Sequence, residues 1–395
     1  MNIGMILDNV FPPDPRVENE AFTLINNGHK VYLFCIDYSH DQKEREVIDG
    51  LIVYRKRLPR HLYRFSALAY SFPYYHISLQ RSIYQFIKDN GIEALHIHDI
   101  QVARSVFMVN REFNLPVVLD LHENRPEIMR YYPFVTKGAG KLLINPSRWK
   151  KFEYRYIQKA SKVIVVTDEA KEHYLSNIAI KNEKVAVVPN FVRPDFYSDY
   201  EEDHDIISRY KGRFVIIYIG DTGLRRGLAT AVQSLELLIP EIPDVLLLFI
   251  GKSKTDLILK DMVRKNGWDD HVDFAGWQDP CLFPSFLLSS DIGICPLHRN
   301  LHHDTTYANK LFQYMAFGKP VIVSNCRAQE NLVNKYRCGL VFQDRDIKDF
   351  ADKILTLYKD KDYYKELSRN SLKAVTTSLN WEISGKSLVN LYKWL

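Results

Sequence analysis

Residues 214–238 read FVIIYIGDTGLRRGLATAVQSLELL, and this stretch decides the fold class. The apolar run Phe214–Ile219 predicts a buried strand, a glycine-rich turn follows it, and Ala229–Leu238 has a helical pattern. The next apolar run, Val245–Ile250, predicts a second strand. A strand, a helix and a strand in this order predict two parallel strands joined by a crossover helix, which is the unit of an α/β domain.

The same alternation extends through the chain in both directions. After this stretch we expect a helix at Asp256–Asn266 and strands at Val272–Phe274, Ile292–Cys295, Pro320–Val323 and Gly339–Val341. Before it we expect strands at Asn2–Leu7, Lys30–Cys35, Leu51–Tyr54, Ala94–His98, Pro116–Leu121, Lys162–Val166 and Lys184–Val188, with helices such as Val17–Asn27 and Tyr74–Asn90 between them. The pattern predicts two α/β domains with parallel sheets.

The length of the chain also indicates two domains. At 395 residues it exceeds what one ordinary core organises, and domains of roughly 150–200 residues are the expectation. Pro189–Asp195 is rich in turn-forming residues and is the predicted hinge. The amphipathic segment Trp381–Leu395 predicts a last helix that packs on the protein.

The composition is that of a soluble globular protein, with 46% hydrophobic and 26% charged residues. We expect no membrane span, because no apolar run approaches the roughly 20 residues that a span requires, and Met1–Val10 reads as a strand rather than a signal peptide. The five cysteines are scattered, which favours a reducing cytosol. A net charge of +5 fits contact with phosphates or an anionic membrane surface, but no motif indicates nucleic-acid binding.

Open parallel sheets bind ligands beyond the carboxyl ends of their strands, so the residues after each expected strand are the first candidates for a site. The first strand is followed by Asp8–Glu18, in which Arg16 opens a helix. Arg16 would line a phosphate or acceptor site, or else it would pair with an acid on the same helix such as Glu20.

Histidines and acids end two further strands of the first half. His96 and His98 face the same side of their strand, as metal ligands do, but no further ligand has a fitting spacing and we expect no metal. Asp99 follows at the end of that strand. His122 lies between acids after the next strand, where it would act as a general base, contact sugar hydroxyls or be structural.

In the second half, the turn Gly220–Gly227 contains Arg225 and Arg226. Glycines let the backbone approach an anion closely, and two guanidinium groups can hold a diphosphate, so the turn is a predicted anion site. An ordinary solvated turn is the alternative. Lys252 would add a further cation, and Trp277 would stack on a nucleobase or belong to the core.

The densest group of candidates is Tyr307–Pro320. Within it, Asn309, Lys310 and Gln313 share one helix face near the N-terminus of the helix. The helix dipole and Lys310 favour a phosphate, and Gln313 offers hydrogen bonds to ribose hydroxyls. The alternative is an amphipathic helix whose polar face is merely wet.

The order and spacing of several motifs resemble the retaining glycosyltransferase family four. These motifs are Pro15-Arg16-Val17, Gly28-His29-Lys30-Val31, Asp120-Leu121-His122-Glu123, Val187-Val188-Pro189-Asn190-Phe191, Gly220 to Gly227, Phe274-Ala275-Gly276, Ser290-Asp291-Ile292, Asn309 to Ile322 and Trp381-Glu382. The resemblance implies the α/β fold called GT-B, in which two Rossmann-like domains with parallel sheets face each other across a deep cleft. Residues 1–190, joined by a C-terminal helix at 380–395 that crosses back, would bind the acceptor, and residues 191–379 would bind the nucleotide sugar.

The resemblance also implies roles for single residues. Arg226 and Lys310 would neutralise the donor diphosphate, Gln313 would hold the ribose, and His122 would lie near the sugar, without any metal. The residues assigned to catalysis are His122, Asp99, Arg226 and Lys310, and those on the acceptor side are Arg16 and Glu123. The residues assigned to the donor are Gly220, Gly223, Arg225, Arg226, Lys252, Trp277, Gln278, Tyr307, Ala308, Asn309, Lys310, Leu311 and Gln313.

Three positions depart from the family pattern. Thr305 and Gln313 stand where the family usually has a pair of glutamates, and Gln313 keeps hydrogen-bonding capacity without charge. Asp221 stands where many relatives have arginine, a loss for which Arg225 would compensate. These departures leave an inactive variant open as an alternative.

We therefore expect a cytoplasmic glycosyltransferase that moves a sugar from a UDP-sugar, GDP-sugar or similar donor to a glycan or lipid-linked acceptor, in cell-surface polysaccharide or glycoconjugate synthesis. A sugar-nucleotide epimerase of the same fold and a non-catalytic partner subunit are the alternatives. Residues 54–82 are basic and rich in aromatics. They predict either peripheral docking on an anionic membrane or an ordinary aromatic core with solvated arginines.

Overall fold

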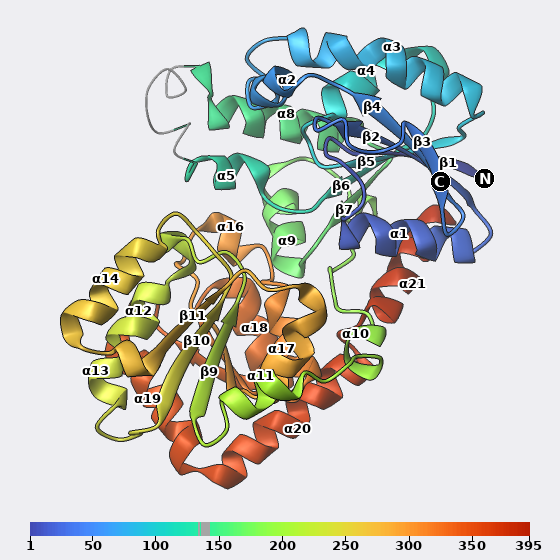
Figure 1. The fold of residues 1–395 in the computed structure, drawn as a ribbon. Helices are drawn as coiled ribbons and strands as arrows, with labels where there is room; N and C mark the ends of the chain where they lie inside the picture. Colours follow the sequence, from blue (N-terminus) through green and yellow to red (C-terminus); the bar gives the residue numbers. More distant parts are fainter. Residues whose placement is uncertain (133–134, 136–142) are drawn as a thin grey trace. The chain divides into compact units, whose positions relative to one another are not determined.

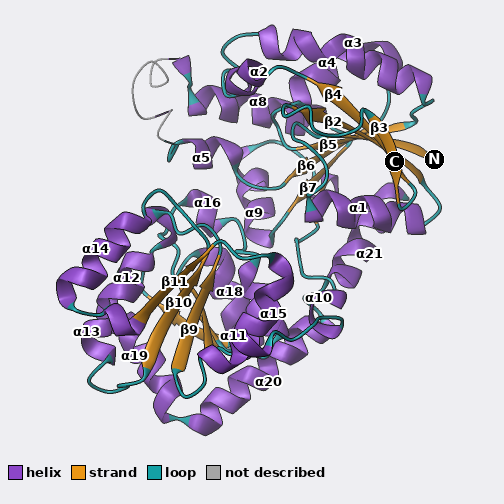
Figure 2. Cartoon of the chain, viewed as in Figure 1, coloured by secondary structure: helices purple, strands orange, loops and turns teal. Residues whose placement is uncertain are grey.

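The computed structural model describes residues 1–132, 135 and 143–395, which form two compact units (Figures 1 and 2). The N-terminal unit comprises Met1–Pro189 together with Ser384–Leu395, and the C-terminal unit comprises Asn190–Ile383. Helix α21 (Trp381–Tyr392) begins in the C-terminal unit and ends in the N-terminal unit.

The N-terminal unit is built on an eight-stranded sheet with the strand order β3-β4-β2-β1-β5-β6-β7-β8. Its strands are β1 (Asn2–Ile6), β2 (Lys30–Asp37), β3 (Arg45–Ile48), β4 (Leu51–Arg57), β5 (Ala94–His98), β6 (Val117–Leu121), β7 (Lys162–Val165) and β8 (Val185–Val187). Its helices, besides α21, are α1 (Pro15–Asn26), α2 (Arg60–Ser66), α3 (Tyr74–Asp89), α4 (Ala103–Phe113), α5 (Arg125–Met129), α8 (Pro146–Lys159) and α9 (Asp168–Asn177).

An edge hairpin departs from the expected all-parallel sheet. Strand β3, which the sequence analysis did not predict, pairs antiparallel with β4. The two residues between the strands, Asp49 and Gly50, have positive φ angles of 47° and 87°. Asp-Gly with both φ angles positive is typical of the two-residue hairpin turn whose twist matches that of the strands. This dipeptide is the signal that would have revealed the hairpin.

The two faces of the N-terminal sheet differ in polarity. Leu95, Ile97, Leu119 and Leu121 belong to an apolar core shared with residues of α3, α4 and α8. Because side chains alternate along a strand, the residues between them point to the opposite face. There lie the histidines of β5 and the aspartate of β6, in contact with α1 and α21.

The C-terminal unit has a six-stranded parallel sheet with the order β11-β10-β9-β12-β13-β14. Its strands are β9 (Phe214–Ile219), β10 (Val245–Ile250), β11 (Val272–Gly276), β12 (Ile292–Cys295), β13 (Val321–Ser324) and β14 (Gly339–Phe342). Its helices are α10 (Asp195–Ser198), α11 (His204–Arg209), α12 (Leu228–Gln233), α13 (Leu235–Leu238), α14 (Asp256–Asn266), α15 (Phe283–Leu288), α16 (Leu301–Asp304), α17 (Lys310–Ala316), α18 (Arg327–Tyr336), α19 (Ile347–Lys359) and α20 (Lys361–Thr377).

Both faces of this second sheet are apolar. On β9, Val215, Ile217 and Ile219 belong to one core cluster, and the alternating residues Phe214, Ile216 and Tyr218 belong to another. Helices cover both faces, as Figure 2 shows. A strand buried on both sides needs a continuous apolar run, which is why the strand was visible in the sequence.

Candidate functional site

A buried charge network lies on the polar face of the N-terminal sheet. Helix α1 begins beside it because Asp14 caps the backbone N–H groups of Arg16 and Val17. Arg16 donates two hydrogen bonds to the Asp120 carboxylate, from Nε at 2.9 Å and from Nη2 at 2.7 Å. Its Nη2 also lies 3.0 Å from Glu20 Oε1. The guanidinium is thus held by partners inside its own unit. The ion pair with Glu20 that the sequence offered as one alternative is present, and an acceptor contact by Arg16 stays a prediction.

His122 lies at the partly exposed edge of this network. Its Nε2 is 2.8 Å from Asp120 Oδ2 and 3.1 Å from His98 Nδ1. Burial by itself would lower the pKa of His122, but the carboxylates of Asp120 and Asp99 outweigh burial and raise the pKa to about 9. At neutral pH His122 is therefore an imidazolium, which is a hydrogen-bond donor and a positive charge rather than a free general base.

Asp99 lies next to His122 at the end of β5. Its Oδ1 accepts a hydrogen bond from the His122 backbone N–H at 3.1 Å, and its Oδ2 is 3.8 Å from His122 Nδ1. Burial raises the pKa of Asp99 to about 6. Its φ angle of 62° is uncommon for a residue with a side chain, a feature that often marks functional sites. The side chains of Asp99 and His122 remain 17% and 19% exposed, so these two predicted catalytic residues lie together and both reach the surface.

Glu123, the other residue assigned to the acceptor side, is engaged nearby. Its Oε1 accepts a hydrogen bond from Arg125 Nη1 at 3.0 Å. Both side chains are partly exposed. An acceptor contact by Glu123 stays a prediction.

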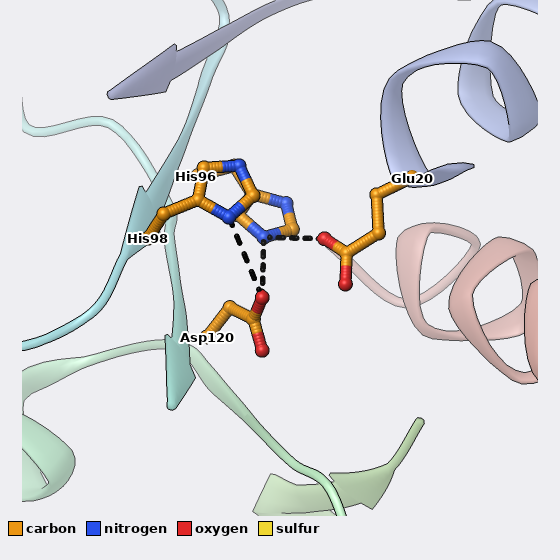
Figure 3. A group of neighbouring side chains, drawn as sticks. All are labelled: Glu20, His96, His98 and Asp120. Carbon is orange, nitrogen blue, oxygen red and sulfur yellow. Dashed lines mark ion pairs between the residues drawn. The ribbon is translucent and has the colours of Figure 1, made fainter. Parts of the chain in front are cut away.

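Four side chains in the deepest part of the network have the arrangement of metal ligands (Figure 3). They are Glu20, His96, His98 and Asp120, all buried, and their ligand atoms lie within 4.8 Å of one another. They come from α1, β5 and β6, so spacing along the sequence did not reveal them. Arg16 pairs with both carboxylates of the group and supplies the positive charge that a metal would supply. That the protein works without a metal stays a prediction.

His96 joins the network to α21. Its Nδ1 lies 2.7 Å from the Tyr392 hydroxyl, and its Nε2 lies 3.1 Å from Glu20 Oε2. Burial by itself would lower the pKa of His96, but Asp120 and Glu20 raise it above its ordinary value. The amphipathic pattern of Trp381–Leu395 predicts a packing helix but does not reveal this contact of the Tyr392 hydroxyl.

In the C-terminal unit, three neighbouring strands end in glycines with positive φ. Gly220, Gly251 and Gly276 stand at the carboxyl ends of β9, β10 and β11, with φ angles of 125°, 137° and 70°. A Cβ atom on Gly251 would overlap the Gly220 carbonyl, and one on Gly227 would overlap the Pro296 carbonyl. The backbone therefore packs here at distances that side chains would prevent.

Three cations gather around the Gly220–Gly227 turn. Arg226 Nε and Arg225 Nη2 lie 3.4 Å and 4.0 Å from Asp221 Oδ2. Lys310 Nζ lies 4.6 Å from the centre of the Tyr218 ring, and a Cβ atom on Gly220 would approach this Nζ to 3.2 Å. Burial lowers the pKa of Lys310 to about 8. Positive charge exceeds negative charge in this group, which suits an anion.

The candidates at and before the start of helix α17 differ in whether their side chains are accessible. It begins at Lys310 after the exposed Asn309, and Gln313 is half-buried one turn on. Ala308 and Leu311 are buried in the core, so only their backbone atoms are available to a ligand.

The remaining donor candidates are spread over several loops. Trp277 is 70% exposed, so its interpretation as a core residue is wrong. Gln278 Nε2 donates to the Ala275 carbonyl at 2.7 Å, and Lys252 is exposed. Tyr307 packs against the rings of Phe191 and Phe312. Gly223 lies in the same turn as Arg225 and Arg226, and its backbone N–H donates a hydrogen bond to Asp221 Oδ1 at 3.2 Å.

The positions of the two usual glutamates carry no charge. Thr305 is buried, and its Oγ1 donates a hydrogen bond to the Leu301 carbonyl at 2.7 Å. Gln313 is neutral as well. A donor at this site would meet cations without the family's acidic pair.

Comparison with known families agrees with this geometry. Residues 16–196 match the family described as Glycosyltransferase Family 4, and residues 199–374 match the family described as Glycosyl transferases group 1. The chain belongs to these glycosyltransferases. The group 1 match contains the Gly220–Gly227 turn and Lys310, and the family 4 match contains His122.

Curated relatives of this glycosyltransferase match it at moderate identity. It is 27% identical over 227 residues to TuaH of Bacillus subtilis, whose name assigns it to teichuronic acid biosynthesis, and the match covers 56% of this chain and 55% of TuaH. It is 22% identical over 383 residues to an uncharacterized glycosyltransferase of Methanocaldococcus jannaschii, with 94% of this chain and 91% of that protein covered. The chain thus spans about half the length of TuaH in that match.

Solved structures with the same fold confirm the GT-B architecture of this glycosyltransferase. Sucrose-phosphate synthase from Thermosynechococcus elongatus matches with a TM-score of 0.78 and 16% identity, covering 100% of this chain and 98% of that chain. Anabaena HepE in complex with UDP matches with a TM-score of 0.74 and 13% identity, covering 100% of both chains.

Proposed function

We propose that this protein transfers a sugar from a nucleotide diphosphate sugar to a glycan or lipid-linked acceptor, with retention at the anomeric carbon, in the synthesis of a cell-surface polysaccharide or glycoconjugate. The observation that carries the proposal is the group of Arg225, Arg226 and Lys310 around the Gly220–Gly227 turn. The UDP in the HepE structure supports a UDP-sugar as the first donor to test, with a GDP-sugar as the alternative. The relation to TuaH supports a polysaccharide product.

The three cations act on the leaving group. As the bond between the sugar and the diphosphate breaks, negative charge grows on the diphosphate, and Arg225, Arg226 and Lys310 stabilise that charge. Lys310 is mainly protonated at neutral pH because its pKa is about 8, and a bound diphosphate raises this pKa further. The guanidinium and ammonium groups take the place of the divalent cation that other enzymes use here, so the proposal requires no metal.

In the N-terminal unit, His122 and Asp99 are the proposed contacts of the sugar. Asp120 holds the His122 ring by its Nε2, at 2.8 Å, and keeps it protonated. We therefore assign His122 the role of an electrostatic and hydrogen-bonding contact, not that of a base.

Thermal stability in the presence of UDP-, GDP-, ADP- and TDP-sugars tests the donor site. A donor at about 100 times its Kd stabilises the protein by roughly 2.7 kcal/mol, so one member of the panel should raise the melting temperature selectively. Arg226→Ala should reduce the shift. Arg264→Ala, an exposed arginine on α14, is the matched control and should keep it. An unchanged melting temperature with every donor would contradict the proposal.

A non-catalytic partner subunit is the second candidate, and the buried, neutral Thr305 favours it. Such a protein would bind the donor but release neither free sugar nor a glycosylated product. Product analysis with the donor that binds separates the two, and it also detects an epimerised nucleotide sugar. The double variant Thr305→Glu with Gln313→Glu should raise turnover if the missing acids limit an active enzyme.

A further inference from the structure

One surface of the N-terminal unit combines exposed aromatic side chains with a basic sequence. Helices α2 and α3 and the turn between them carry it (Figure 1). From Leu51 to Lys88 the sequence contains no aspartate or glutamate. The same span contains the cations Arg55, Lys56, Arg57, Arg60, Arg64, Arg81 and Lys88. Positive charge is thus not balanced within this segment.

Five large apolar side chains project from this surface, and we call them the aromatic patch. The patch consists of Tyr63 (60% exposed), Phe65 (41%), Phe72 (47%), Tyr74 (55%) and Ile77 (57%). The rings of Phe65 and Tyr74 meet edge-on with their centres 5.9 Å apart, so the patch continues from one helix to the other. For these residues the interpretation as an aromatic core is wrong.

The aromatic patch is not needed for the core, because each helix buries a different face. On α2 the inner residues are Leu62 and Ser66. On α3 the buried residues are Tyr75, His76, Leu79, Ile83, Phe86 and Ile87. The patch therefore adds apolar surface in contact with water, which a soluble protein rarely retains without an interaction to serve.

Three exposed cations lie on the same two helices as the aromatic patch. Arg81 and Lys88 follow Tyr74 on the outer face of α3, seven and fourteen residues on, and both are exposed. Arg60 is exposed at the start of α2. The described part of the chain gives none of these three an ion pair, whereas Arg55 pairs with Glu46 and Arg57 with Glu44.

We propose that this surface docks on an anionic lipid bilayer, with the aromatic patch at the level of the headgroups and Arg60, Arg81 and Lys88 on lipid phosphates. Aromatic rings favour that interfacial depth, and each cation near an anionic surface adds attraction. Charge complementarity favours an anionic bilayer over a protein partner. The segment offers only positive charge, and it has no acid that would recognise a particular protein. The inference goes beyond the proposed sugar transfer and stands independently of it.

Co-sedimentation of the full chain with vesicles tests the docking surface. Vesicles of phosphatidylcholine alone are compared with vesicles that also contain phosphatidylglycerol. We expect binding to the anionic vesicles and a loss of binding as salt is raised, because exposed charges are screened. Equal binding to both kinds of vesicle would overturn the proposal.

Two sets of variants locate the contact. Arg60→Gln with Arg81→Gln should weaken partition into anionic vesicles about 30-fold, since each cation contributes roughly a fivefold gain. Phe65→Ser with Tyr74→Ser should reduce binding at every salt concentration. The controls Leu257→Ser with Ile258→Ser, and Lys373→Gln, change exposed residues of the C-terminal unit and should bind as the wild type does.

Two further readouts keep the result unambiguous. The variants at Arg60, Arg81, Phe65 and Tyr74 should keep the melting temperature and the donor-induced shift of the wild type, because these residues lie in the N-terminal unit and the donor candidates lie in the C-terminal unit. Patch variants that bind vesicles like the wild type would refute the assignment. So would sedimentation velocity showing a wild-type dimer that the patch variants dissociate, because the surface would then serve a second copy of the chain.

Discussion

The two units treat buried positive charge in opposite ways. In the N-terminal unit, Arg16 pairs with Asp120 and Glu20, and His122 pairs with Asp120. In the C-terminal unit, the Lys310 ammonium group lies over the Tyr218 ring, and burial lowers its pKa. The first arrangement is neutralised without a ligand, whereas the second becomes more favourable when an anion arrives. The balance of charge, more than the number of charged residues, separates a structural network from a ligand site.

The largest expected effect comes from removing the centre of the neutralised network. Asp120→Ala leaves Arg16, His96 and His122 without their common carboxylate, and it should lower the free energy of unfolding by about 3–5 kcal/mol. Urea unfolding measures this loss of stability, and hydrogen exchange of the amides in β5 and β6 locates it. Asp221→Ala, in an exposed ion pair, should cost less than about 1 kcal/mol. Similar costs for both variants would erase the distinction between the units.

A variant of the Gly220–Gly227 turn should show the reverse pattern: it should lose donor affinity and keep its stability. Arg226→Ala removes a charge-assisted contact to the donor, worth roughly 1.5–3 kcal/mol, and should weaken donor binding about 10- to 150-fold. The free energy of unfolding should stay within about 0.5 kcal/mol of the wild type. Isothermal titration calorimetry gives the first quantity and urea unfolding the second. A stability loss without an affinity loss would place Arg226 among the structural charges.

The pH dependence of stability tests whether His122 belongs to the neutralised network of the N-terminal unit. Its pKa rises from 6.5 in the unfolded chain to about 9 in the folded protein, so its pairing stabilises the fold fully below pH 6.5 and is lost as the pH rises through 9. The contribution is about 2 kcal/mol after allowance for partial exposure. His122→Gln should therefore flatten the pH profile of unfolding between pH 6.5 and 9. A parallel profile for wild type and variant would show that Asp120 does not hold the imidazolium.

Lys310 should give the opposite slope of stability against pH, with a smaller change in stability than His122 gives. Its pKa falls from 10.5 to about 8 on folding, so the unfolded chain binds more protons between these values and stability rises with pH across that window. Lys310→Met should raise the free energy of unfolding at pH 7 by about 1 kcal/mol. Donor affinity should fall at least tenfold in the variant, and in the wild type it should decline above pH 8. A destabilised Lys310→Met with unchanged donor affinity would assign Lys310 to the core.

The sequence predicted the fold where burial imposes a simple pattern. The strands β9, β10 and β12 coincide with the expected ranges, because strands buried on both faces are continuous apolar runs. Strand β3 has only half-buried and exposed residues, so no apolar run announced it. The helix expected at Ala229–Leu238 is divided at Ser234, where the pattern alone gives no break.

The candidate sites were predictable in part for a related reason. Local spacing predicted the Arg16–Glu20 pair and the shared side of His96 and His98, because one helical turn or two strand residues set those relations. Asp120 and Tyr392 reach the same network across 104 and 296 residues of sequence, and only the strand order and the path of α21 bring them in. Trp277 could not be placed from the sequence, because the pattern around a single aromatic residue does not show whether its side chain is buried or exposed.

The contact between Tyr392 and His96 has a consequence for how the protein is made. Asn190–Ile383 is one continuous stretch that has all its residues as soon as it leaves the ribosome. The N-terminal unit is begun first but completed last, because its final helical segment, Ser384–Leu395, is synthesised after the whole C-terminal unit. Until Ser384–Leu395 docks, His96 and the charge network lack the cover of the Tyr392 side chain.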